Sequence, residues 1–160
     1  MDAVAEDIVG STSLAEVLGD EAWETLLGWH DETLRGHFAQ HHGHEVVSTG
    51  DGFFVGFDAQ QDAIACAIGI QQTLESHRRE HGFAPKVRIG IHFATAQQVG
   101  DNYRGKGVHE AARIAAIAAG GEILASRETA EGTPFKLSEP RTVELKGISE
   151  PVEVVSVAWR

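Results

Sequence analysis

Apolar side chains recur along the chain with two different periods, and the change from one period to the other predicts the order of helices and strands. Residues 21–40 place Trp23, Leu34 and Phe38 on one side at near-helical spacing, which predicts a helix that packs on a sheet. Residues 86–95 instead alternate between apolar and polar side chains, which predicts a strand.

Two β-branched and aromatic runs and one longer apolar run lie between these segments. The runs at residues 45–49 and 53–57 flank Gly50-Asp51-Gly52, which predicts a β-hairpin with a tight turn and Asp51 at its tip. The apolar run at residues 63–74 predicts a second long helix.

The N-terminal segment predicts a first strand that ends at Asp7 and a short helix that follows it. Ser11 or Thr12 is expected to cap this helix, because hydroxyl side chains accept hydrogen bonds from the first free N–H groups of a helix. Gly19-Asp20 then separates the short helix from the long one.

The resulting order, β, α, β, β, α, β, is typical of a ferredoxin-like core. We therefore expect an α+β fold with a mainly antiparallel sheet and helices on one face, plus an appended αβ unit. No repeat or linker interrupts the 160 residues, so residues 1–160 are expected to form one domain. The appended unit is expected to contain a Gly-rich loop at residues 100–107 and a helix at residues 108–119. Three strands are expected to follow, at residues 122–125, 142–145 and 152–159.

Composition narrows the classes of function. The 13 basic and 24 acidic residues give a net charge of −11, which disfavours binding to nucleic acid and to anionic membranes. The single cysteine, Cys66, allows no intramolecular disulfide. Residues 1–6 lack the basic and apolar regions of a signal peptide, and no apolar run approaches the length of a membrane span. We expect a cytoplasmic protein without a membrane partner.

Asp7 and Asp51 are the first candidates for chemistry. In a split βαββαβ sheet the first strand and the hairpin lie side by side, so their two carboxylates are expected to converge. Hard carboxylate ligands suit Mg²⁺ or Mn²⁺, and two such ions can activate a hydroxyl and neutralise a triphosphate. Each aspartate alone would more often be a turn former or a cap.

Four segments together resemble a known family. They are residues 7–12 (DIVGST), 49–53 (TGDGF), 105–113 (GKGVHEAAR) and 144–147 (ELKG), and they span essentially the whole chain. In these segments the chain resembles the catalytic domain of class III nucleotide cyclases, of the bacterial single-domain type.

The resemblance implies how metal and phosphates are held. It gives Asp7, Asp51 and the backbone carbonyl of Ile8 to two Mg²⁺ or Mn²⁺ ions per active site. It gives the backbone N–H groups of residues 10–12 (Gly10, Ser11 and Thr12) to the β- and γ-phosphates. The free N–H groups at a helix start are physically suited to that role.

The resemblance also implies two cations and a histidine at the reaction. Arg113 matches the arginine that stabilises charge on the α-phosphate, and Lys146 matches the lysine that contacts the terminal phosphates. His109 stands where the family has an asparagine that orients the ribose, and it lies four residues before Arg113 on the same helix face. Without the motif, Arg113 and His109 would be read as surface residues.

Base selection is where the chain departs from the family. Val47 stands in place of the lysine that reads adenine, and valine cannot form a hydrogen bond with a base. Asn102 stands in place of the partner aspartate, and its amide can pair with either purine. Both ATP and GTP therefore remain open as substrates.

By the same resemblance, two protomers form a head-to-tail homodimer. Each site would take Asp7 and Asp51 from one chain, and residues 47, 102, 109 and 113 from the other. The expected reaction converts a nucleoside triphosphate into the 3′,5′-cyclic nucleotide and pyrophosphate. The alternative is a degenerate regulatory domain that binds nucleotide or a partner with little turnover.

Two other site types are weaker hypotheses. A two-metal phosphodiesterase or nuclease usually needs more ligands than two aspartates supply. His37 and His41 are spaced as a possible zinc pair, but no nearby cysteine or spaced carboxylate completes a tetrahedral site.

Overall fold

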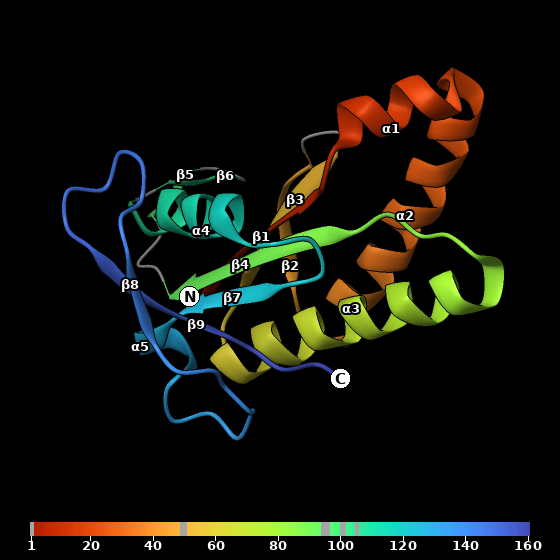
Figure 1. Cartoon of the computed structure of the whole chain (residues 1–160). Helices are drawn as coiled ribbons and strands as arrows, with labels where there is room; N and C mark the ends of the chain where they lie inside the picture. Colours follow the sequence, from red (N-terminus) through yellow and green to blue (C-terminus); the bar gives the residue numbers. More distant parts are fainter. Residues whose placement is uncertain (1, 49–50, 94–96, 100–101, 105) are drawn as a thin grey trace.

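A mixed sheet forms the centre of the molecule in the computed structural model (Figure 1). The structure describes residues 2–48, 51–93, 97–99, 102–104 and 106–160, and for residues 2, 97–99, 102–104 and 106–109 the description covers the backbone. Within that part, seven strands run in the order β2-β3-β1-β4-β7-β9-β8, and β5 pairs with β6 separately. The strands are β1 Asp2–Ile8, β2 His44–Ser48, β3 Gly52–Phe57, β4 Val87–Phe93, β5 Gln97–Val99, β6 Asn102–Arg104, β7 Ile123–Ser126, β8 Arg141–Val143 and β9 Val152–Ser156.

The helices lie in two layers. The described helices are α1 Ser11–Leu18, α2 Asp20–Gln40, α3 Gln60–His81, α4 Lys106–Ile117 and α5 Arg127–Ala130. Figure 1 shows α2 and α3 on one side of the sheet and α4 on the other. The larger core lies between the sheet and α2 and α3, where Leu34, Phe53, Ile64 and Ile89 are fully buried.

The predicted ferredoxin-like core is confirmed. β1 pairs antiparallel with both β3 and β4, and β2 pairs antiparallel with β3. The helices of this core, α1 to α3, belong to one face. The appended unit joins through the parallel pairing of β4 with β7, and its helix α4 covers the opposite face.

Three local predictions are wrong. Neither Ser11 nor Thr12 caps α1; Gly10 does so with a left-handed backbone (φ 65°), and no side-chain cap bond forms. The expected loop at residues 100–107 contains β6, and α4 begins at Lys106 rather than residue 108. Residues 100, 101 and 105 lie outside the described part.

α4 lies very close to the sheet because small residues face each other there. Ala3 and Ala5 of β1 pack against Ala111 and Ala115 of α4. A β-carbon on Gly90 of β4 would lie 2.3 Å from the backbone nitrogen of Ala115. The absence of a side chain at Gly90 therefore sets the distance between α4 and the sheet.

Candidate active site

Two aspartates lie at the end of the sheet where β1 stops and β3 starts. Asp7 pairs in register with Gly52, the first residue of β3. Asp51 directly precedes that strand, and its carbonyl oxygen accepts a hydrogen bond from the Ile8 N–H at 3.0 Å. Both aspartates are half-buried. The structure thus places Asp7 and Asp51 on adjacent strand ends, as the sequence predicts.

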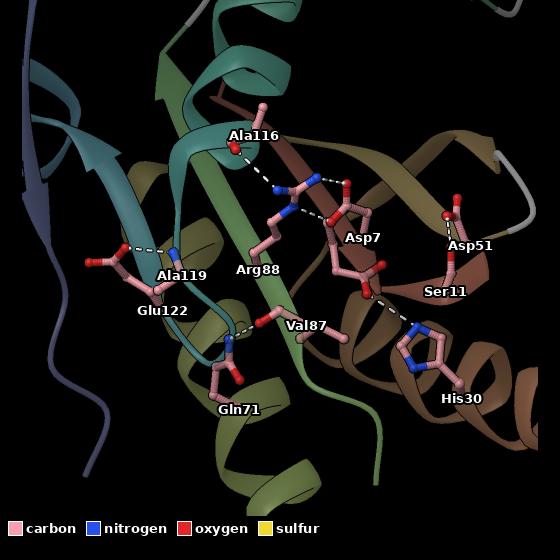
Figure 2. A network of polar contacts seen from close by, with 11 residues as sticks. Asp7, Ser11, His30, Asp51, Gln71, Val87, Arg88, Ala116, Ala119 and Glu122 are labelled. Carbon is pink, nitrogen blue, oxygen red and sulfur yellow. Dashed lines mark hydrogen bonds and ion pairs between the residues drawn. The ribbon is translucent and has the colours of Figure 1, made fainter. Parts of the chain in front are cut away.

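Each carboxylate is held by a donor from another element (Figure 2). Arg88 of β4 donates to both oxygens of Asp7, from Nε to Oδ1 at 2.6 Å and from Nη2 to Oδ2 at 3.1 Å. Ser11, the first residue of α1, donates from Oγ to Oδ2 of Asp51 at 2.7 Å. The hydrogen bond to Asp7 raises the pKa of Arg88. Both carboxylates are therefore oriented, and the charge of Asp7 is compensated.

Arg88 also contacts α4. Its Nη1 donates to the backbone carbonyl of Ala116 at 3.0 Å, in the last turn of that helix (Figure 2). A cation is favourable there because helix C-terminal carbonyls carry partial negative charge. The alternating pattern predicts that Arg88 lies in a strand, but it indicates no role for the side chain. In the sequence, Arg88 is only a charged residue at a polar position of an alternating strand. Its role follows from the strand register, which puts Arg88 opposite Asp7.

A second ionisable residue lies directly behind Asp7. Glu6 points into the core and is 3% exposed, and its Oε1 lies 3.1 Å from Nε2 of His30 on α2. The two atoms are not aligned as a hydrogen bond, so we interpret the contact as electrostatic. Burial raises the pKa of Glu6, and His30 opposes that rise. No local pattern in the sequence indicates a role for Glu6 or His30.

Residues 4–157 match the model of the adenylate and guanylate cyclase catalytic domain. The chain belongs to this family. The match includes Asp7, Asp51 and Arg113, and it runs through all of the strands around the carboxylates.

Solved cyclase structures share the fold of this cyclase domain. The guanylyl cyclase Cya2 superposes with a TM-score of 0.87 at 25% identity, covering 98% of this chain and 90% of that one. The adenylyl cyclase CyaB from P. aeruginosa superposes with a TM-score of 0.82 at 24% identity, covering 98% and 92%. One of these neighbours is named a guanylyl cyclase and the other an adenylyl cyclase, so the shared fold does not determine the base of the substrate.

Relatives of known sequence are longer than the cyclase domain. An adenylate cyclase of Mycosarcoma maydis is 32% identical over 152 residues, which cover 78% of this chain and 6% of that protein. Among the first relatives found, the chain spans 27% to 42% of their length.

The start of α1 lies beside the carboxylates of the cyclase domain. Gly10 turns the chain with a left-handed backbone, and Ser11 begins the helix while it holds Asp51. Thr12 is exposed in the first turn. The first N–H groups of a helix have no partner within the helix, so this end suits an anion.

The two positions expected to select the base, Val47 and Asn102, lie on elements near each other. Val47 is 39% exposed on β2 and pairs with Phe54, which packs toward the alanines beneath α4. Val47 therefore lies on the α4 face of the sheet. Asn102 begins β6, and Cα atoms of β6 come within 8 Å of β2. The side chain of Asn102 lies outside the described part.

The two cations that the sequence predicts at the reaction, Arg113 and Lys146, lie apart from the carboxylates of their own chain. Arg113 is exposed on α4, on the opposite side of the helix from Ala111 and Ala115, which pack on the sheet. Lys146 is exposed in the turn after β8, at the far edge of the sheet from β2. Neither cation pairs with another residue in the described ranges. His109 lies in α4, and its side chain is outside the description.

The histidines near the end of α2 have structural partners. His37 Nε2 lies 2.9 Å from the hydroxyl of Thr73 on α3, and His41 Nδ1 lies 2.9 Å from the His37 carbonyl. Burial and the nearby His41 lower the pKa of His37. Across the described residues, no three His, Cys, Asp or Glu side chains are grouped to hold a metal ion. Nor does any described helix have the length and apolar character to cross a membrane.

Proposed function

We propose that the chain is a metal-dependent nucleotide cyclase that converts ATP or GTP into the 3′,5′-cyclic nucleotide and pyrophosphate. The observation that carries this proposal is the position of Asp7 and Asp51 on adjacent strand ends, with Ser11 in the first turn of α1 bonded to Asp51. Carboxylates and a helix N-terminus in one place offer the two features that a metal-bound triphosphate requires. Membership of the cyclase family supports the reaction type.

The donor set fits Mg²⁺ or Mn²⁺. Asp7, Asp51 and the Ile8 carbonyl offer hard oxygen ligands, and such ions complete their coordination with water and substrate phosphates. Two bound ions would lower the pKa of the ribose 3′-hydroxyl and neutralise the leaving pyrophosphate. Ser11 orients the Asp51 carboxylate, and Arg88 orients that of Asp7.

The remaining groups of the site are proposed to come from a second copy of the chain. Arg113 is exposed and faces away from the sheet that carries Asp7, so it serves best as a group presented to a partner. In a head-to-tail homodimer, Arg113 would stabilise the negative charge that develops on the α-phosphate, and Lys146 would contact the terminal phosphates. His109 would replace the asparagine that orients the ribose.

Base choice is proposed to be relaxed. Val47 can contact a purine but offers it no hydrogen bond, and the amide of Asn102 can donate to or accept from either base. A pocket without a buried donor or acceptor that demands one partner discriminates weakly between related ligands. We therefore expect the preference for ATP over GTP to be small.

The test is incubation of the purified chain with Mn²⁺ and each of ATP, GTP, CTP and UTP, with mass spectrometric detection of products. A cyclic purine nucleotide and pyrophosphate are expected. Asp51→Ala should abolish them, whereas Asp58→Ala, at an exposed aspartate just after β3, should not. Nucleotide binding with metal but without product would instead support a regulatory domain, for which the loss of hydrogen bonding at Val47 is the favouring observation.

A further inference from the structure

A chain of hydrogen bonds connects α4 to the sheet on the face that carries Gly90. Glu110 of α4 lies 2.8 Å from His92 of β4, measured from Oε2 to Nε2. The other ring nitrogen of His92, Nδ1, lies 2.8 Å from the hydroxyl of Ser126 on β7. Ser126 in turn lies 2.6 Å from the hydroxyl of Thr129, which accepts a hydrogen bond from the Phe93 N–H at 2.6 Å.

The groups at the two ends of this series of hydrogen bonds determine which atom donates in each bond. A carboxylate can only accept, so a neutral His92 carries its proton on Nε2 and donates to Glu110. Nδ1 of His92 then accepts from Ser126, and Ser126 accepts from Thr129. With this assignment, each hydrogen bond in the series has one donor hydrogen and one acceptor atom. His92, Ser126 and Thr129 are 6%, 1% and 0% exposed, so an unpaired group at any of them would be costly.

Glu110 contacts one of three positions of β4 that hold α4 in place. The α4-facing positions of β4 are Arg88, Gly90 and His92. Arg88 holds the carbonyl of Ala116 in the last turn, and Gly90 admits the middle of the helix. His92 holds Glu110 in the second turn, so this pair fixes the end of α4 that the other anchors leave free.

We infer that Glu110 is a positioning residue for catalysis, acting through His92 on the placement of Arg113. This inference rests on the proposed function. Glu110 and Arg113 are three residues apart on one rigid helix, so rotation or lift of the N-terminal half of α4 moves the guanidinium. A displacement of about 1 Å at a catalytic group can cost about 10²-fold in rate. Substrate affinity, which depends mainly on the carboxylates and α1, is not affected.

The first test compares three variants by steady-state kinetics. Glu110→Ala should lower kcat by about 10- to 100-fold with KM changed less than about 2-fold. Glu110→Gln should stay near wild type, because its amide oxygen still accepts from His92. Glu128→Ala is the matched control, since Glu128 lies 3.8 Å from the same histidine nitrogen but is 74% exposed. An unchanged kcat in Glu110→Ala, or failure of Gln to rescue, would overturn the inference.

Mixed dimers separate an effect through α4 from a general loss of folding. Glu110→Ala mixed with Asp51→Ala can form one site with intact carboxylates and an intact α4, so turnover should recover. Glu110→Ala mixed with Arg113→Ala cannot form such a site, and turnover should stay low. Equal recovery in both mixtures, or recovery in neither, contradicts a role through α4.

Hydrogen exchange tests the inference without turnover. Amides of residues 111–117 should exchange faster in Glu110→Ala than in Glu110→Gln, Glu128→Ala or wild type, while amides of α3 keep their rates. If wild type makes no cyclic nucleotide, the proposed function fails, and this comparison still decides whether Glu110 holds α4. Unchanged exchange in α4 would refute the anchoring itself.

Discussion

Replacement of Gly90 by alanine tests whether the distance between α4 and the sheet controls catalysis. The new β-carbon would lie 2.3 Å from the Ala115 nitrogen, 2.5 Å from the Ala111 carbonyl oxygen and 2.8 Å from the Ala115 Cα. All three atoms are helix backbone, so no side chain can rotate away. Ordinary contact begins near 3.4 Å, and α4 would have to withdraw by about 1 Å.

Two separate effects are expected from this withdrawal. Overpacking a close contact by one methyl group costs about 1–3 kcal/mol of unfolding free energy. A shift of about 1 Å in the helix that carries Arg113 should also lower kcat by about 10²-fold. Because most molecules stay folded after such a loss of stability, the fall in kcat measures position and not unfolding.

The assay combines urea unfolding with turnover measured well below the unfolding temperature. Gly28→Ala and Gly36→Ala in α2 are matched controls, because a β-carbon there meets no atom within 4 Å. Both should gain about 0.5–1 kcal/mol of stability, since alanine favours the helix, and keep wild-type turnover. A Gly90→Ala protein with wild-type stability and kcat would refute the close-packing argument.

Three further predictions concern residues around the same sheet. Burial raises the pKa of Glu6 from its ordinary value of about 4.5, so the folded chain holds a proton that the unfolded chain releases. The contribution of Glu6 to stability is therefore full below about pH 4.5 and is lost as pH rises through the folded pKa. In urea unfolding, Glu6→Gln should lack this decline. If the unfolding free energies of wild type and Glu6→Gln changed in parallel with pH, the prediction would be wrong. Ser11→Ala removes the donor that orients Asp51, so the Mn²⁺ concentration for half-maximal activity should rise about 10- to 100-fold, and an unchanged titration would dismiss that role. Burial raises the pKa of the Cys66 thiol to about 12, so iodoacetamide should label it in urea and not in the native protein at pH 8, whereas rapid native labelling would argue for an open core.

The long elements could be predicted from the sequence because each has a strong period. The helix at residues 21–40 and the strand at residues 86–95 appear as α2 and β4, each with its start shifted by one residue, and residues 94–95 lie outside the described part. The predicted helix at residues 63–74 is longer at both ends, Gln60–His81, because its polar ends carry no apolar signal. β5, β6 and α5 have three or four residues each, which is too short for any period to be recognised.

The candidate site was predictable only where local sequence determines it. The hairpin and the first strand placed Asp51 and Asp7 on neighbouring elements, and the structure confirms that placement. Ser11 carries the local signal of a helix cap, but its hydroxyl bonds Asp51, forty residues away, instead of the helix. Tertiary contacts of this kind leave no pattern in the local sequence.

The polar residues of β4 illustrate the same limit and explain why the strand matters. In the sequence, Arg88 and His92 are merely the polar members of an alternating strand. In the fold, the helix above that face gives each of them a partner, Ala116 for Arg88 and Glu110 for His92. Arg88 also holds Asp7, so one strand fixes both the carboxylate that is proposed to bind metal and the helix that carries Arg113. In the proposed dimer these two elements would serve different active sites, and β4 is the strand that contacts both of them.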